Sequence, residues 1–468
     1  MATTVGERSG GLDAYFKISE RGSTVRTEIV AGATTWMTMA YILFVNPSIL
    51  GSVKDRQGTS LPFDKVLIVT ALVAGVMTIM MGVVANYPFA IAAGLGLNAY
   101  VTFTLVAQLK LTWPEAMGVI VLEGLAITVL VATGFREAVL NAIPLDLKRA
   151  IGVGIGAFIA FIGLVNAGFA IRTPVEGGPP VTIGALSHWK FLVFFLGFVI
   201  TAALVVRKVK GALLIGILGT TIFATIVNEA KHLHLWKNGI AALPHTWAKV
   251  PHGSDFNLLG KFTLGGPFAK LGFISAVVAV FAVMLSDFFD TMGTAVGLGE
   301  QAGLTDREGR LPGIGRVLIV DSLAAAAGGA ASSSSNTTYI ESASGIAAGG
   351  RTGLTSVVVG VLFLLSLLLS PIAGVIPPEA TAPALILVGY FMMTLVKDID
   401  WQNAEIGIPA LLTIVVQPFT FSITNGVGAG FITFTAIKIL RGKFAEVHPL
   451  MYISTAAFLA YFIRGLFA

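Results

Sequence analysis

Long apolar stretches separated by short polar ones dominate the chain. Many run for about 20 residues with almost no charge, which is the length that an α-helix needs to cross a bilayer. The stretches expected as spans are 30–50, 64–86, 88–108, 114–134, 146–168, 189–207 and 211–229, then 272–299, 314–330, 337–349, 353–371, 378–397, 405–422 and 424–441. The last apolar stretch, 449–467, fits a further span or a helix in the membrane plane equally well. The pattern predicts an all-α polytopic membrane protein.

Basic residues gather at the ends of the expected spans and predict the orientation. With the N-terminus in the cytoplasm, the inner loops and span edges hold more Lys and Arg than the outer ones, as the positive-inside rule requires. Residues 1–26 are then a cytoplasmic segment, and the polar stretch 231–271 is an external loop. We therefore expect a multi-pass protein of the cytoplasmic (inner) cell membrane.

Composition agrees with a membrane protein and excludes several kinds of chemistry. Hydrophobic residues make up 55% of the 468 residues and charged residues only 12%, whereas a soluble domain carries about 25% charged residues. The net charge of +5 is no sign of nucleic-acid binding, because the basic residues lie at span ends. There is no cysteine, and no phosphate loop, HExxH motif or Cys/His cluster is present. We expect no metal, no cofactor and no enzymatic activity.

The second half of the chain repeats features of the first. The stretch Lys65–Ala74 (KVLIVTALVA) returns as Arg316–Ala325 (RVLIVDSLAA). Ile143-Pro144 and Ile376-Pro377 each precede a span. Chance similarity between apolar sequences can explain either match alone. Because the two matches occur in the same order in both halves of the chain, an internal repeat is favoured over chance. With seven spans in each half, an odd number, the two halves would have inverted topology, which is a common plan of transporters.

Each copy of the repeat is followed by a short segment whose composition does not favour the start of a helix. Ala90–Asn98 contains two glycines, and Ser332–Glu341 is rich in Ser and Thr. Non-helical backbone at this depth survives only where it is buried in protein or lines a cavity. We therefore expect each segment to be an extended stretch followed by a half-helix, with the N-terminal N–H groups of both half-helices directed at a ligand near the midplane.

Acidic residues inside the apolar stretches are the strongest candidates for function. A charge at mid-bilayer costs about 2.5–3.5 kcal/mol on insertion scales, so Asp287 and Glu341 are interpreted as parts of a substrate and proton site. Asp290 lies three residues after Asp287, near the same helix face. One of the two could contact substrate while the other carries a proton or fixes helix packing. Asn98 is a candidate ligand, or a structural cap of its half-helix.

Three further polar residues in the spans are weaker candidates. Glu123 and Asp321 could act directly, could bond neighbouring helices or could relay protons. Thr38 could line the site, but hydrogen bonding to its own helix is the plainer interpretation. The glycines at 152, 154 and 156 lie in an apolar span and indicate close helix packing.

At these residues the chain resembles the AzgA-like branch of the nucleobase:cation symporters, nearly from end to end. The strings that carry the resemblance are Ala40–Pro47, Gly94–Tyr100, Asp287–Thr294, Ser334–Ser342 and Phe419–Gly426. The resemblance implies fourteen spans arranged as a seven-plus-seven inverted repeat, as in the uracil carriers, with short strands before the half-helices of spans 3 and 10. It also implies a core domain (27–134 and 272–373) that moves in an elevator-like way against a gate domain (135–230 and 374–468).

The resemblance also implies which residues bind substrate. The family's substrate-facing acid in the eighth span corresponds to Asp287, with Asp290 as its neighbour. The family's acid after the short strand of the tenth span corresponds to Glu341, and its asparagine in the third span corresponds to Asn98. The related uracil and xanthine carriers resemble the chain at Thr337-Thr338-Tyr339-x-Glu341, where backbone amides also contact the base. Candidate binding residues are thus Asp287, Glu341, Asn98, Thr338, Tyr339, Ile340 and Leu95, and candidate proton carriers are Asp287, Asp290 and Glu341.

The function implied is proton-coupled import of purine bases such as hypoxanthine, guanine and adenine, by a homodimer. Ring N–H groups of a neutral purine can donate to two carboxyl groups, which agrees with this function. An anion carrier on the same inverted-repeat plan is the main alternative, although buried carboxylates would repel its substrate. An intramembrane aspartyl enzyme is less favoured, because Asp287 and Asp290 lie on one helix and no second catalytic motif appears.

Overall fold

The computed structural model describes residues 11–133, 143–174, 179–230, 235–236, 240–244, 246–306 and 311–463. The helices up to the long loop and at its end are α1 (Gly11–Phe16), α2 (Val25–Met39), α3 (Ile42–Leu50), α4 (Phe63–Met80), α5 (Leu95–Ala99), α6 (Trp113–Ala132), α8 (Leu145–Asn166), α9 (Trp189–Val206), α10 (Ala212–Ala230) and α11 (Gly266–Leu271). Those of the second half are α12 (Phe273–Gln301), α13 (Ile314–Ala330), α14 (Ser342–Ala347), α15 (Gly353–Leu365), α16 (Ser370–Ala373), α17 (Pro378–Met393), α18 (Ala404–Thr420), α19 (Ile423–Leu440) and α20 (Pro449–Ile463).

Short strands and non-α turns complete the secondary structure. The strands are β1 (Ile91–Ala93), β2 (Ala170–Arg172), β3 (Val181–Ile183) and β4 (Asn336–Thr338). π-Helical turns follow α4 and α5, at Met81–Ala85 and Tyr100–Gln108. Single 3₁₀ turns lie at Gly253–Phe256, Ser366–Leu369, Thr394–Asp398 and Phe444–Glu446.

The helices confirm a multi-pass membrane protein. Among the described residues, nine helical segments are long and apolar enough to cross a membrane, and three further apolar helices are shorter. The expected fourteen spans and the inverted repeat stay predictions, as does the cytoplasmic N-terminus. Residues 1–10 of the expected cytoplasmic segment and parts of the expected external loop (231–234, 237–239 and 245) lie outside the described residues.

Helix boundaries follow local signals in the sequence. α8 and α17 begin directly after Pro144 and Pro377, as the repeated Ile-Pro pairs predict, because proline is well tolerated where a helix starts. α6 begins with a capping box in which Thr112 and Glu115 satisfy each other's free backbone N–H groups. α13 occupies 314–330, the predicted span.

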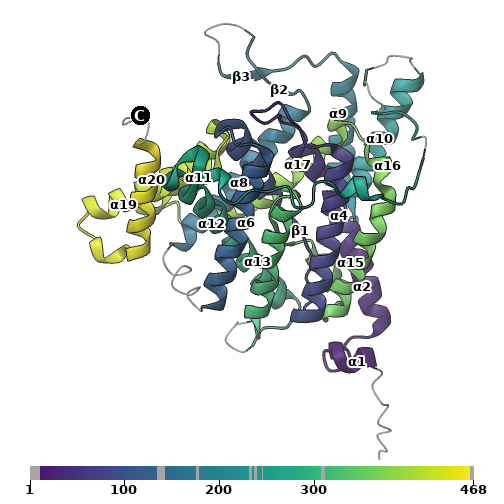
Figure 1. The fold of residues 1–468 in the computed structure, drawn as a ribbon, viewed down its shortest axis with the longest axis horizontal. Helices are drawn as coiled ribbons and strands as arrows, with labels where there is room; N and C mark the ends of the chain where they lie inside the picture. The colour runs from purple at the N-terminus through teal and green to yellow at the C-terminus, as the bar shows by residue number, and fades with distance from the viewer. Residues whose placement is uncertain are drawn as a thin grey trace, which may run out of the picture.

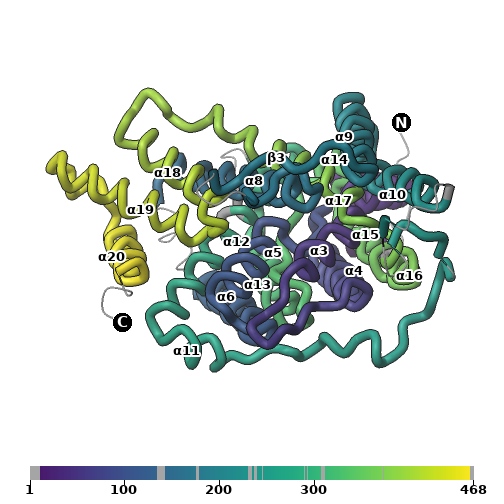
Figure 2. The backbone as a smooth tube through the Cα atoms, turned by 90° about the horizontal axis from the view of Figure 1, so that it is seen from above, coloured from purple at the N-terminus to yellow at the C-terminus, as the bar shows by residue number. Residues whose placement is uncertain are grey.

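Helix pairs far apart in the sequence form the bundle (Figure 1). α4 packs against α15 and α6 against α13, while α8 packs against both α17 and α18. Seen from above, α3, α4, α6 and α13 lie together, and α8 and α17 lie beside them with α9 and α10 toward one end and α18–α20 toward the other (Figure 2). Gly156 of α8 faces Gly389 of α17 so closely that a Cβ on either would meet the other's backbone. Close packing at this glycine segment is as predicted.

Three of the expected spans are interrupted. The first is broken at Ala40 and Tyr41, between α2 and α3. The stretches expected at 88–108 and 337–349 each begin with a strand, β1 or β4, followed by a half-helix, α5 or α14. An extended stretch followed by a half-helix is the predicted form of both segments. β1 lies inside the bundle (Figure 1), where non-helical backbone can be satisfied by neighbouring protein.

The C-terminal stretch forms helix α20, which packs against α12 and α19. Its described part has 15 residues, fewer than the roughly 20 of an untilted span. Both interpretations of 449–467, a span and an in-plane helix, therefore stay open.

Candidate substrate site

The centre of the site is a buried pair of strands. β1 and β4 pair antiparallel, with Ile91 opposite Thr338 and Ala93 opposite Asn336. All six strand residues are buried. The pairing joins the two repeat-related segments, so the first and second halves of the chain meet at this point.

Polar side chains from two helices hold the strands in place. The Thr78 hydroxyl of α4 donates to the Ile91 carbonyl and accepts from the Ile91 N–H, both at 2.9 Å. The Asp321 carboxylate of α13 accepts from the N–H and the hydroxyl of Thr338, both at 2.7 Å, and from the Thr291 hydroxyl at 2.6 Å. Asp321 therefore anchors β4 and joins α13 to α12, and bonding to a neighbouring helix is one of the interpretations given above for this residue.

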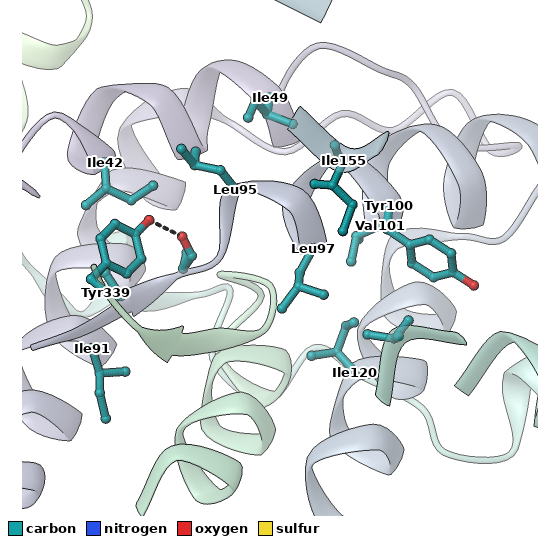
Figure 3. Packing of buried hydrophobic residues seen from close by; sticks show 14 of the residues in the cluster. Ile42, Ile49, Ile91, Leu95, Leu97, Tyr100, Val101, Ile120, Ile155 and Tyr339 are labelled. Carbon is teal, nitrogen blue, oxygen red and sulfur yellow. Dashed lines mark hydrogen bonds between the residues drawn. The ribbon is translucent and has the colours of Figure 1, made fainter. Parts of the chain in front are cut away.

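The strands continue into the half-helices through further bonds between the two segments. The Tyr339 N–H donates to the Ala90 carbonyl, and the Gly94 N–H to the Ser335 carbonyl, both at 2.9 Å. The Tyr339 hydroxyl reaches across to the Ala93 carbonyl, drawn as the dashed line in Figure 3. The N–H groups of Thr338 and Tyr339 thus already donate to acceptors within the protein.

Glu341 stands at that start, directly before α14, and is partly exposed. Its Oε1 accepts a 2.6 Å hydrogen bond from the hydroxyl of Tyr41, a buried residue at the break between α2 and α3. The sequence pattern did not single out Tyr41. The signal that could have indicated it is a tyrosine hydroxyl inside an apolar span, close to Pro47. The side chain of Ile340, also expected at the site, is 56% exposed.

Thr38 lies next to the same half-helix. Its hydroxyl donates back to its own helix, at 2.8 Å to the Thr35 carbonyl, as the plainer interpretation expects. It also lies 2.8 Å from the Ser344 hydroxyl and 3.4 Å from the Glu341 carbonyl. Thr38 therefore joins α2 to α14 and supports the position of Glu341.

The two aspartates of α12 have opposite environments. The side chain of Asp290 is exposed, and Glu341 and Tyr339 are among the ionisable groups close to it. Asp287, one turn earlier, is 0% exposed, and neither of its carboxylate oxygens accepts a hydrogen bond from a donor in the described residues. The acid within reach of Asp287 is Glu123 of α6, which is also fully buried.

Asn98 of α5 is fully buried, and both polar atoms of its amide have no hydrogen-bond partner among the described residues. A buried amide without partners is costly, so its amide is available to a ligand or a water. Leu95, in the same half-helix, is buried and belongs to the hydrophobic core around the strands, with its side chain directed away from that of Leu97 (Figure 3).

Two cavities lie away from these acids. One, of about 400 Å³, is apolar and lies between α4, α13 and the segment around Leu259. The other, of about 480 Å³, lies beside the C-terminal end of α8 and is lined by Lys190 and Glu379 among others. Neither of these two cavities is lined by Asp290 or Glu341.

Residues 26–462 match the model of a permease family. The chain belongs to this permease family. It is 38% identical to the adenine permease AdeP of Escherichia coli, over 98% of this chain and 97% of that protein. It is also 38% identical to the guanine/hypoxanthine permease PbuG of Bacillus subtilis, over 97% of this chain and 99% of that protein. Membership of the permease family gives this chain a transport role.

Solved structures show the same fold at low sequence identity. The transmembrane domain of the cyanobacterial bicarbonate transporter BicA superimposes with a TM-score of 0.60 at 14% identity, over 86% of this chain and 97% of that one. The murine anion transporter Slc26a9, in an inward-facing state, gives a TM-score of 0.59 at 11% identity, over 94% of this chain and 74% of that one. At such identities the likeness concerns the fold alone.

Proposed function

We propose that this permease imports purine bases, with hypoxanthine, guanine and adenine as candidate substrates, together with a proton. The purine class is supported by the full-length relatives, which are named adenine and guanine/hypoxanthine permeases. The observation that carries the proposal is that two accessible acids, Asp290 and Glu341, lie near each other, with Glu341 directly after the paired strand β4.

We assign the substrate-facing role to Asp287, as the family resemblance implies, and also to the accessible Asp290 one turn later. A neutral purine presents ring N–H groups along its edge, and a carboxylate accepts such donors strongly. Tyr41 occupies one oxygen of Glu341 and leaves the second for a ligand. Asn98 adds an amide that can donate and accept at once, which suits the mixed edge of hypoxanthine or guanine.

Transport would follow from movement of the strand-bearing core (27–134 and 272–373) against the gate (135–230 and 374–468). The fold shared with BicA and Slc26a9 supports an alternating-access plan of this kind. The same likeness raises the alternative of an anion carrier. Two accessible carboxyl groups argue against an anion, because like charges repel and desolvation strengthens that repulsion. A homodimer with a cytoplasmic N-terminus stays a prediction.

The test is uptake of labelled hypoxanthine into proteoliposomes under an inward proton gradient, with guanine, adenine, xanthine, uracil and sulfate as competitors. We expect purines to compete, and Asp290→Asn and Glu341→Gln to abolish uptake. Asp64→Asn, an exposed acid in the first turn of α4, is the matched control and should leave uptake unchanged. Competition by sulfate and not by purines would move the function to the anion carrier.

A further inference from the structure

A contact between the two proposed domains lies at the break between α18 and α19. On the core side it is formed by the π-helical segment Tyr100–Gln108, which directly follows α5 and its Asn98. On the gate side it is formed by residues 420–424, where α18 ends and α19 begins. We call these two segments together the interdomain contact. π-Helical turns are rare and frequently lie at functional sites.

The core supplies hydrogen-bond donors to the end of a gate helix. Phe421 ends α18 in the left-handed region, with φ of 52° and ψ of 35°, which is uncommon for a bulky residue. The last carbonyls of a helix have no donor within that helix. Here the Gln108 amide donates to the carbonyls of Thr420 and Phe421, at 2.5 and 2.9 Å. The Thr104 hydroxyl lies 3.5 Å from the same Phe421 carbonyl.

Tyr100 makes the second polar link, at the other end of the π-helical segment. Its hydroxyl accepts a 2.9 Å hydrogen bond from the hydroxyl of Thr424, in the first turn of α19. The same hydroxyl donates to the Ala279 carbonyl of α12 at 3.1 Å. Tyr100 is buried. It therefore joins α5 and α12, which carry proposed substrate ligands, to each other and to the gate.

Apolar groups fill the rest of the interdomain contact. The Phe421 ring packs edge-on against Phe103 of the core and against Phe158 of α8, with ring centroids 5.7 and 5.4 Å apart. Gly96 of α5 lies so close to Ile155 of α8 that a Cβ on the glycine would be 2.5 Å from a side-chain carbon. Packed interfaces of this kind switch between discrete arrangements and do not deform continuously. Movement of the core along the gate must therefore separate them.

We propose that the interdomain contact is a latch, closed in this conformation and released each time the core moves against the gate. Gln108 and Tyr100 are its positioning residues, because they hold α5, and with it Asn98, against the gate. The inference rests on the proposed movement of the core and identifies the contacts that this movement breaks. Bonds that form in only one of two states shift the equilibrium toward that state.

Reversible cross-linking tests whether the latch must open during transport. The chain has no cysteine, so Gln108→Cys combined with Thr420→Cys supplies both thiols. Both positions are exposed, so a reagent can reach them. A short bifunctional methanethiosulfonate reagent joins the two thiols through mixed disulfides, and a reductant releases them.

In proteoliposomes we expect the linked protein to lose both net uptake and exchange of labelled hypoxanthine. The reduced protein should recover both, which a merely structural role of these residues would not predict. Each single cysteine variant, treated with the same reagent, should keep its transport and so separates linkage from modification of one thiol. Full transport by protein shown to be cross-linked would overturn the latch.

Substitutions test the hydrogen bonds themselves. Gln108→Leu removes the amide donors and Thr424→Val removes the hydroxyl, each at nearly constant volume. The reporter is Thr104→Cys, at a position that is 0% exposed, whose thiol can react with a maleimide only when the latch opens. A hydrogen bond contributes a factor of about 2 to 10 to an equilibrium constant. We therefore expect labelling to be about threefold to tenfold faster in either variant than in the reporter alone.

Matched controls complete this experiment. Thr394→Val removes an exposed hydroxyl of the gate, and Gln57→Leu changes an exposed amide of the core. Both should leave the labelling rate and hypoxanthine uptake unchanged. Labelling rates in Gln108→Leu and Thr424→Val equal to those of the controls would overturn the role of the two bonds.

The outcomes separate the latch from the proposed function. Transport that continues in the linked protein overturns the latch and leaves purine transport intact. Absence of hypoxanthine flux in the wild type without any cross-link, including exchange, would instead overturn the proposed function itself.

Discussion

The hydrogen bond from Tyr41 to Glu341 gives the sharpest test of how the substrate site is built. Tyr41→Phe removes one hydroxyl and keeps the ring, so the packing at the break between α2 and α3 is preserved. The bond is 2.6 Å long and ends on a carboxyl oxygen. Hydrogen bonds to charged groups contribute about 1.5–3 kcal/mol, which corresponds to a factor of roughly 10 to 100 in an equilibrium constant.

The partial exposure of Glu341 decides where in that range the effect falls. Water can solvate the freed oxygen in part, so we expect the lower end, a loss of about tenfold in hypoxanthine affinity. The assay is equilibrium binding of labelled hypoxanthine to purified protein. Tyr390→Phe, which changes a tyrosine that is 58% exposed on α17, is the matched control. An unchanged dissociation constant in Tyr41→Phe would refute the idea that Tyr41 orients Glu341 for substrate.

Two further predictions concern the scaffold. Asp321→Ala leaves the Thr338 N–H of β4 without its acceptor, so we expect the protein to lose about 1–3 kcal/mol of stability. The loss is measured as a lower unfolding temperature in detergent, and an unchanged temperature would contradict the anchoring role. Gly389→Leu pushes a side chain into the backbone of Gly156, and overpacking costs about 1–3 kcal/mol. We expect lower yield of folded protein and lost uptake, whereas Gly219→Leu, which meets open space on α10, should behave as the wild type.

Apolar runs and turn residues predicted much of the fold, because burial in a bilayer leaves few options for the backbone. The stretches expected at 64–86 and 189–207 correspond to helical segments at Phe63–Ala85 and Trp189–Val206. The glycine-rich and serine-rich segments contain the two strands that pair at the centre. In each case the signal is local: apolar length, small residues or a proline before the helix.

Side-chain partners could not be predicted in the same way, because they depend on packing between distant segments. Asp287 and Asp290 lie three residues apart, so periodicity puts both near one face of α12 and cannot decide which is accessible. In the structure Asp287 is buried within reach of Glu123 of α6, whereas Asp290 is exposed. The bond from Tyr41 to Glu341 likewise joins residues 300 positions apart. The hydrophobic pattern did not predict the break in the first span at which Tyr41 lies.

The roles of the two aspartates of α12 are tested most directly by hypoxanthine binding to purified Asp290→Asn and Asp287→Asn, measured side by side with the wild type. The two variants make the same chemical change one helical turn apart. We predict that both variants lose hypoxanthine binding. Asp290 has an exposed carboxyl group near Glu341, and no donor among the described residues occupies the carboxylate oxygens of Asp287, so both can accept from a base. Wild-type binding in either variant would contradict the substrate-binding role of that acid.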